Sequence, residues 1–194
     1  GADGHTKFSE VGQLAGVSNT DWSWAGLFAD LDNDGWKDLL ITNGYLRDFT
    51  DLDFLKYTVA DAQMNAVKKG NLDFKTFELV RKMPSNTISS YVFRNSADLQ
   101  FRNVTKEWGL HEPAISNCAA YADFDNDGDL DLIIGRNNSP VTIYRNNQSQ
   151  KSDNHYIKVS LTGQSRNTAA IGAKVFLYTN GAPQVLEKFP VRGY

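Results

Sequence analysis

The chain has 194 residues, enough for one or two domains that each bury a hydrophobic core. Hydrophobic residues make up 41% and charged residues 22%, and no apolar stretch approaches the roughly 18 residues that span a membrane. The net charge is −3, and the sequence contains no basic run or basic helix. The composition therefore argues against a transmembrane segment and against a nucleic-acid-binding protein.

The beginning of the chain predicts short strands and one acidic loop. Residues 8–11, 24–29 and 38–42 are compact apolar segments bounded by turn residues, which is typical of strands. Residues 30–38 read Asp-Leu-Asp-Asn-Asp-Gly-Trp-Lys-Asp, so carboxylates occupy positions 1, 3, 5 and 9 around a glycine at position 6. Four carboxylates this close repel one another unless a cation lies among them. Oxygen ligands at such spacing, with a glycine that permits a sharp turn, are typical of a calcium loop.

The next segment, about residues 46–88, predicts a helical insertion. Apolar residues recur at helical spacing over residues 52–66, Thr50 begins a capping-box pattern, and Gly70 fits a helix C-cap. A second helix is predicted over residues 73–83, before a proline. Two interpretations stay open. The helices either cover an edge or a face of the neighbouring strands, or form a lid that binds a partner.

The second half of the chain repeats the first at a constant offset of 93 residues, without a gap from Phe8 to about Gly44. Residues 123–131 read Asp-Phe-Asp-Asn-Asp-Gly-Asp-Leu-Asp and again carry carboxylates at positions 1, 3, 5 and 9. Four short antiparallel strands per repeat are typical of a propeller blade. The remaining strands of the two repeats are predicted at residues 91–95, 101–104, 119–122, 131–134 and 142–146.

The end of the chain predicts a separate small β module. Residues 146–152 are a polar linker. Strands are predicted after it at residues 156–161, 173–178 and 185–191, with Asn-Gly at 180–181 as a hairpin turn.

The sequence offers no catalytic motif. The histidines His5, His111 and His155 are isolated from one another, and they are expected at the surface. Cys118, the single cysteine, cannot form an internal disulfide and is expected to be a small buried residue.

Other readings of the acidic loops are weaker. An EF-hand needs a glutamate at position 12 and flanking helices, whereas position 12 is Ile41 or Ile134 and the flanking segments predict strands. Two copies with four carboxylates each disfavour an ordinary turn without an ion. Magnesium prefers fewer protein ligands and more water. A catalytic carboxylate pair is disfavoured because nothing distinguishes an acid from a base.

Together these motifs resemble FG-GAP/VCBS repeats. The resemblance rests on the D-x-D-x-D-G-x-x-D loops, the apolar runs that follow them, and the Tyr-Arg-Asn and Phe-x-x-Val strands. Asn-His-Tyr at 154–156, Ile-Gly-Ala-Lys-Val at 171–175 and the closing Arg-Gly-Tyr are similar to the ASPIC/UnbV module that follows such repeats in cartilage-acidic-protein-like proteins. The helical insertion is larger than the repeat requires, and the tail stops where the module would continue.

The resemblance implies an integrin-α-like β-propeller that is only partly present. Residues 1–147 would form about two four-stranded blades with calcium hairpin loops, and residues 153–194 a truncated β module. Two blades cannot close a ring, because propellers need about four to eight. The chain is therefore expected to be the C-terminal part of a longer bacterial protein that is secreted, periplasmic or attached to the cell surface. Association through open blade edges is a further expectation.

The resemblance also implies two Ca²⁺ sites. Trp36 and Asp129, at position 7 of the loops, would ligate through their backbone carbonyls. The side-chain ligands would be Asp30, Asp32, Asp34 and Asp38 in the first loop and Asp123, Asp125, Asp127 and Asp131 in the second.

These features favour a calcium-stabilised, non-catalytic extracellular module for binding or adhesion, with a protein or a glycan as its ligand. Trp22, Trp36 and Tyr45 near the loops are candidate contacts, although packing between strands is the alternative role for them. An accessory or substrate-binding region of a secreted carbohydrate-active enzyme and a structural assembly segment are the alternatives. The sequence does not identify the ligand.

Overall fold

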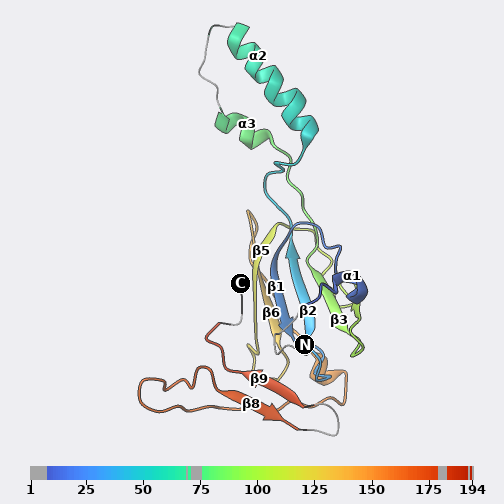
Figure 1. The fold of residues 1–194 in the computed structure, drawn as a ribbon, viewed down its shortest axis with the longest axis vertical. Helices are drawn as coiled ribbons and strands as arrows, with labels where there is room; N and C mark the ends of the chain where they lie inside the picture. Colours follow the sequence, from blue (N-terminus) through green and yellow to red (C-terminus); the bar gives the residue numbers. More distant parts are fainter. Residues whose placement is uncertain (1–7, 69, 71–75, 179–182, 192, 194) are drawn as a thin grey trace.

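The computed structural model describes residues 8–68, 70, 76–178, 183–191 and 193, and within them the fold is mainly β, with three separate antiparallel sheets (Figure 1). None of these sheets is closed. The first sheet has the strand order β1 (Ser23–Ala29), β2 (Asp38–Asn43), β3 (Tyr91–Asn95) and β4 (Phe101–Asn103). The second has the order β5 (Ser116–Ala122), β6 (Asp131–Arg136) and β7 (Thr142–Tyr144), and the third pairs β8 (Lys174–Leu177) with β9 (Gln184–Glu187).

The hairpins predicted around the two acidic loops are confirmed. β1 pairs with β2 in a register that places Ala29 opposite Asp38, and β5 pairs with β6 with Ala122 opposite Asp131. The strand order predicted for one repeat is complete in the first sheet, where β3 and β4 follow β2. The second sheet contains the same first three strands.

The main hydrophobic core lies between these two sheets. β2 is buried along its whole length, as predicted for the run that follows the acidic loop. Leu40 of β2 and Val92 of β3, which are 1% and 0% exposed, belong to one cluster with Ala119 of β5 and Ile134 of β6. Figure 1 shows β1 and β2 beside β5 and β6, so both acidic loops extend from the same packed unit.

Two predicted strands are absent from the structure. Residues 8–11 and 156–161 form no strand, and Phe8 is 92% exposed. An alternating apolar pattern becomes a strand only where another backbone supplies the ladder hydrogen bonds. Neither segment pairs with a strand within the described ranges.

The insertion is helical, as predicted. It contains the π-helix η1 (Phe54–Val59), α2 (Ala60–Lys68) and α3 (Thr76–Lys82), while residues 71–75 of the predicted second helix lie outside the described residues. The N-terminal cap is not Thr50, because the N–H of Phe54 donates to Asp51 Oδ1 at 2.8 Å. The helices project away from the sheets (Figure 1), so the interpretation that they cover an edge or a face is wrong.

Other details test smaller expectations. Cys118 is exposed, which corrects the prediction, because the pleat turns Ala119 inward to the core and its neighbour outward. His111 and His155 are exposed as expected, whereas His5 and the predicted turn at 180–181 lie outside the described residues. Among the helices that the structure describes, none is long and apolar enough to cross a membrane.

The position of the core predicts that alanine substitutions of two leucines change the free energy of unfolding by different amounts. Leu40→Ala removes side-chain volume from the contact between the sheets, so the free energy of unfolding should fall by about 3 kcal/mol. Leu52→Ala is the matched control, because that side chain is 75% exposed and its loss should change the free energy by less than about 0.5 kcal/mol. Urea denaturation of both variants measures the difference. Equal losses would contradict the assignment of this core.

Candidate metal centre

Both acidic loops adopt the same backbone turn. At position 4, Asn33 and Asn126 have φ of 56° and 61°, and at position 6, Gly35 and Gly128 have φ of 93° and 92°. Asparagine and glycine are the residues that enter this left-handed region at least cost. Gly128 also lies against the ring of Tyr156 and has no room for a side chain. The repeated sequence thus produces a repeated geometry.

The aspartate at position 9 ties each loop to the end of the third strand of its sheet or to the residues just after it. Asp38 is 0% exposed, and its carboxylate accepts hydrogen bonds from the N–H of Leu31 at 3.0 Å and of Asn95 at 3.0 Å. Asp131 accepts the equivalent bonds from Phe124 at 2.9 Å and Asn146 at 2.8 Å. Each carboxylate oxygen has two lone pairs, so these bonds leave room for a cation.

The structure brings most of the predicted ligands together. Side-chain oxygens of each group lie within 4.8 Å of one another, and each group could hold a metal ion. Asp34 and Asp131 lie outside these groups. At position 7, Trp36 and Asp129 donate their N–H groups to the position 5 carboxylates. The two groups are Asp30, Asp32 and Asp38 in the first loop and Asp123, Asp125 and Asp127 in the second.

Unpaired buried oxygens support a cation in both loops. Asp32 Oδ1, Asp123 Oδ1 and Asp127 Oδ2 are buried and have no hydrogen-bond partner in the part of the chain that the structure describes. A buried carboxylate oxygen without a partner is costly, and a metal ion would remove that cost. The donors are all hard oxygens, which favours Ca²⁺ or Mg²⁺ over metals that prefer nitrogen or sulfur.

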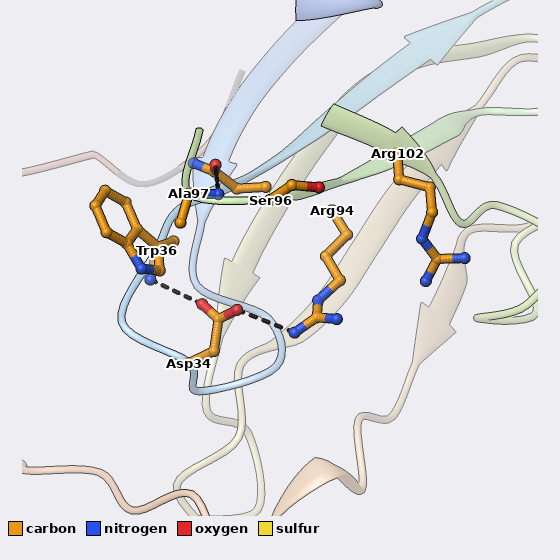
Figure 2. A pocket seen from close by; sticks show the side chains of 7 residues that line it. Asp34, Trp36, Arg94, Ser96, Ala97 and Arg102 are labelled. Atoms are coloured by element: carbon orange, nitrogen blue, oxygen red, sulfur yellow. Dashed lines mark hydrogen bonds and ion pairs between the residues drawn. The ribbon is translucent and has the colours of Figure 1, made fainter. Parts of the chain in front are cut away.

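Two arginines that the sequence analysis did not assign lie against the carboxylates. Arg94 Nε is 2.5 Å from Asp32 Oδ2, and its Nη2 is 3.1 Å from Asp34 Oδ2 (Figure 2). Arg145 Nη2 is 2.6 Å from Asp125 Oδ2. Each arginine follows an aromatic residue and precedes an asparagine, and this repeated pattern is the sequence feature from which they could have been identified. They balance part of the negative charge at positions 3 and 5.

Burial changes the acidity of the first loop. It raises the pKa of Asp30 to about 6 and that of Asp38 to about 7, although backbone N–H groups oppose the change and neighbouring carboxylates add to it. Burial also raises the pKa of Asp32, against the attraction of Arg94. The metal-free loop therefore resists carrying its full negative charge.

These pKa values predict a pH-dependent first site. As the pH falls, Asp38 takes up a proton at about 7 and Asp30 at about 6, so protons compete with the metal and the metal affinity should fall. Without metal, the same two groups should stabilise the fold as the pH falls from about 7 toward their ordinary value of 3.8, since only the folded chain holds the protons. Calorimetric titration of Asp125→Asn, which weakens the second site, measures the affinity. An affinity independent of pH would contradict the prediction.

The two loops contact each other directly. Asn33 Nδ2 of the first loop donates to Asp129 Oδ1 of the second at 2.8 Å, and the N–H of Ser149 donates to the other oxygen of Asp129 at 2.8 Å. Asp129 is 0% exposed, and its role as a side chain was missed by the sequence analysis. Asn146 Nδ2 also donates to the carbonyl of Leu31 at 2.6 Å. The predicted linker thus carries the short helix η2 (Gln148–Gln150) and bonds to both loops.

The C-terminal segment also lies on the loops. Asn154 Nδ2 donates to the carbonyl of Asp32 at 3.0 Å. Lys158 Nζ lies 2.8 Å from Asn126 Oδ1 and 3.6 Å from Asp123 Oδ2. Gln184 of β9 lies against Gly35. The structure therefore places the predicted β module in contact with both acidic loops.

The contact between loops predicts unequal effects of two matched substitutions. Asn33→Ala and Asn126→Ala each place alanine at the same left-handed position, so the backbone cost should be similar. Only Asn33→Ala removes a hydrogen bond from the buried carboxylate of Asp129. It should therefore lower the free energy of unfolding by about 1–3 kcal/mol more than Asn126→Ala does. Thermal or urea unfolding compares the variants. Equal effects would show that the bond contributes nothing.

The aromatic residues near the loops have mixed surroundings. Trp22 is 49% exposed and its ring centroid lies 5.5 Å from that of Tyr45, so these two residues pack against each other. Trp36 is 44% exposed at the rim of a polar hollow of about 410 Å³ that also contains Arg94 and Arg102 (Figure 2). This hollow lies beside the first acidic loop, with Asp34 on its wall.

Comparison with protein-family models, with curated proteins and with solved structures finds no match for this chain. The resemblance to FG-GAP/VCBS repeats and to the ASPIC/UnbV module therefore stays a prediction from the sequence motifs.

Proposed function

We propose that the chain is a calcium-stabilised, non-catalytic module that binds a protein or a glycan outside the cell. The observation that carries the proposal is the pair of equivalent acidic hairpin loops, each with at least one buried carboxylate oxygen that has no hydrogen-bond partner within the described residues. Arg94 and Arg145 balance part of the negative charge of these loops, and a bound cation would offset the repulsion that remains.

Calcium fits the donor set better than magnesium. Calcium accepts six to eight oxygen ligands in flexible geometry, whereas magnesium keeps several waters and demands a strict octahedron. Each loop offers carboxylates at four odd positions and backbone carbonyls between them. Asp30, Asp32, Asp34 and Asp38 would hold one ion with the carbonyl of Trp36. Asp123, Asp125, Asp127 and Asp131 would hold the other with the carbonyl of Asp129.

Two observations support a partial β-propeller as the architecture. The first two sheets share the order of their first three strands, and each places an acidic loop between its first two. They also pack against each other through one hydrophobic core, as neighbouring blades do. In this proposal, calcium fixes the hairpin turns, and the surface beside them binds the partner.

The hollow beside the first loop is the best candidate contact surface. An exposed tryptophan next to polar and charged side chains is a common arrangement for stacking on a sugar or anchoring a protein. Arg94, which is paired with Asp32 and Asp34, and Arg102, which is paired with Glu107, line the hollow, and the exposed Trp36 lies at its rim. An extracellular or periplasmic location fits a protein that depends on millimolar calcium.

Calcium removal tests the proposal. At a free calcium concentration about one hundred times the dissociation constant, each site should add about 2.7 kcal/mol to the free energy of unfolding. EDTA should therefore lower the Tm, and added calcium should restore it. Asp32→Asn and Asp125→Asn should each remove part of the calcium effect, while Asp61→Asn on the exposed side of α2 should remove none. A Tm that responds to neither EDTA nor calcium would overturn the proposal.

A further inference from the structure

Within the described residues, the second sheet has no fourth strand, whereas the first sheet has β4. In the first sheet β4 pairs with β3, whereas nothing in the described ranges pairs with the outer edge of β7. Ile143 in the middle of β7 is 64% exposed, while Val92, the equivalent residue of β3, is 0% exposed. An open edge with an exposed apolar residue is a site for adding another strand.

Residues 8–17, at the beginning of the described chain, resemble in sequence the segment that contributes the fourth strand of the first sheet. Residues 8–17 correspond to residues 101–110, which form β4 and the turn after it, at the offset of 93. The N–H of Ala15 donates to the carbonyl of Val11 at 2.7 Å, and the N–H of Trp108 donates to the carbonyl of Val104 at 2.8 Å. Two further backbone bonds match in the same way, from Gly16 and Gly109 at 3.2 Å and from Val17 and Leu110 at 2.9 Å. Residues 11–17 thus repeat the turn of residues 104–110.

Residues 8–11 pair with no strand in the part of the chain that the structure describes. They are followed by the short helix α1 (Gly12–Ala15), which lies beside β3 in Figure 1, and Gly16 is close to the carbonyl of Phe101 in β4. Val11 is 49% exposed, although Val104, its equivalent, is 1% exposed in the core. Within the described residues, a segment with the sequence of a fourth strand has no sheet to pair with, and the second sheet has no fourth strand.

We propose that residues 8–11 of a second copy of this chain add to the outer edge of β7. Val11 of the donor then lies opposite Ile143, as Val104 lies opposite Val92 in the core between the first two sheets. The contact is head-to-tail, so each copy still offers one free donor and one free edge, and association continues into a ring or an open filament. By analogy with the β3–β4 register, Phe8, Ser9 and Glu10 lie opposite Asn146, Arg145 and Tyr144.

This association does not depend on the ligand or the metal proposed above. Failure of the calcium experiment leaves the sheet edge unchanged, and failure of the association leaves the calcium sites unchanged.

Complementation between two variants of the full chain tests the inference. Val11→Asp disables the donor and Ile143→Lys disables the edge; both side chains are largely exposed, so each variant should fold. The wild type should associate in a concentration-dependent way in sedimentation experiments, and each variant should associate about tenfold more weakly or not at all. Mixing the two variants should give a dimer and nothing larger, because one intact donor meets one intact edge.

Phe77→Asp is the matched control, because Phe77 is exposed and belongs to α3, a helix that projects away from the sheets (Figure 1), and this variant should associate like the wild type. A labelled peptide of residues 8–17 should bind to the wild type and to Val11→Asp but not to Ile143→Lys. The inference is overturned by a wild type that stays monomeric and ignores the peptide. It is also overturned by association that Phe77→Asp abolishes, or by a mixture of variants that stays monomeric.

Discussion

Buried aspartates at the ends of two hairpins are the constraint on which the rest of this structure depends. Asp38 and Asp131 lie at the first residue of β2 and β6, where each accepts one backbone N–H from its own loop. Each also accepts a second N–H, Asp38 from the end of β3 and Asp131 from Asn146, just after β7. These bonds hold the loop against the sheet, and three carboxylates of each loop lie within 4.8 Å of one another. The same geometry that orders the hairpin concentrates negative charge, which is why a cation is central to the proposed function.

The acidic loops also connect parts of the chain that are far apart in sequence. The bond between Asn33 and Asp129 joins the first loop to the second loop. Asn146 of the linker and Asn154 of the C-terminal segment each donate to a backbone carbonyl of the first loop. Lys158 reaches a carboxylate of the second loop. A cation in either loop would therefore act on the contact between the sheets as well as on its own hairpin. In the proposed function, the metal would therefore help to hold the module together.

The sequence predicted the local features well, because each depends on residues close in the chain. The spacing of the aspartates around Gly35 and Gly128 predicted two hairpins, and the offset of 93 residues predicted their equivalence. Contacts across the fold were not predictable in this way. Nothing near Asn33 indicates that it meets Asp129, and the exposure of Cys118 depends on which face of β5 turns toward the core. Residues 8–11 have a strand pattern but pair with no strand among the described residues.

The stoichiometry of calcium binding tests the central claim most directly. Native mass spectrometry of the metal-depleted chain, titrated with calcium, counts the ions bound to each molecule. The account predicts two ions on the wild type and one on each of Asp32→Asn and Asp125→Asn, since each substitution affects one of the two carboxylate groups. A wild-type chain that binds no calcium, or variants that bind as much as the wild type, would contradict it.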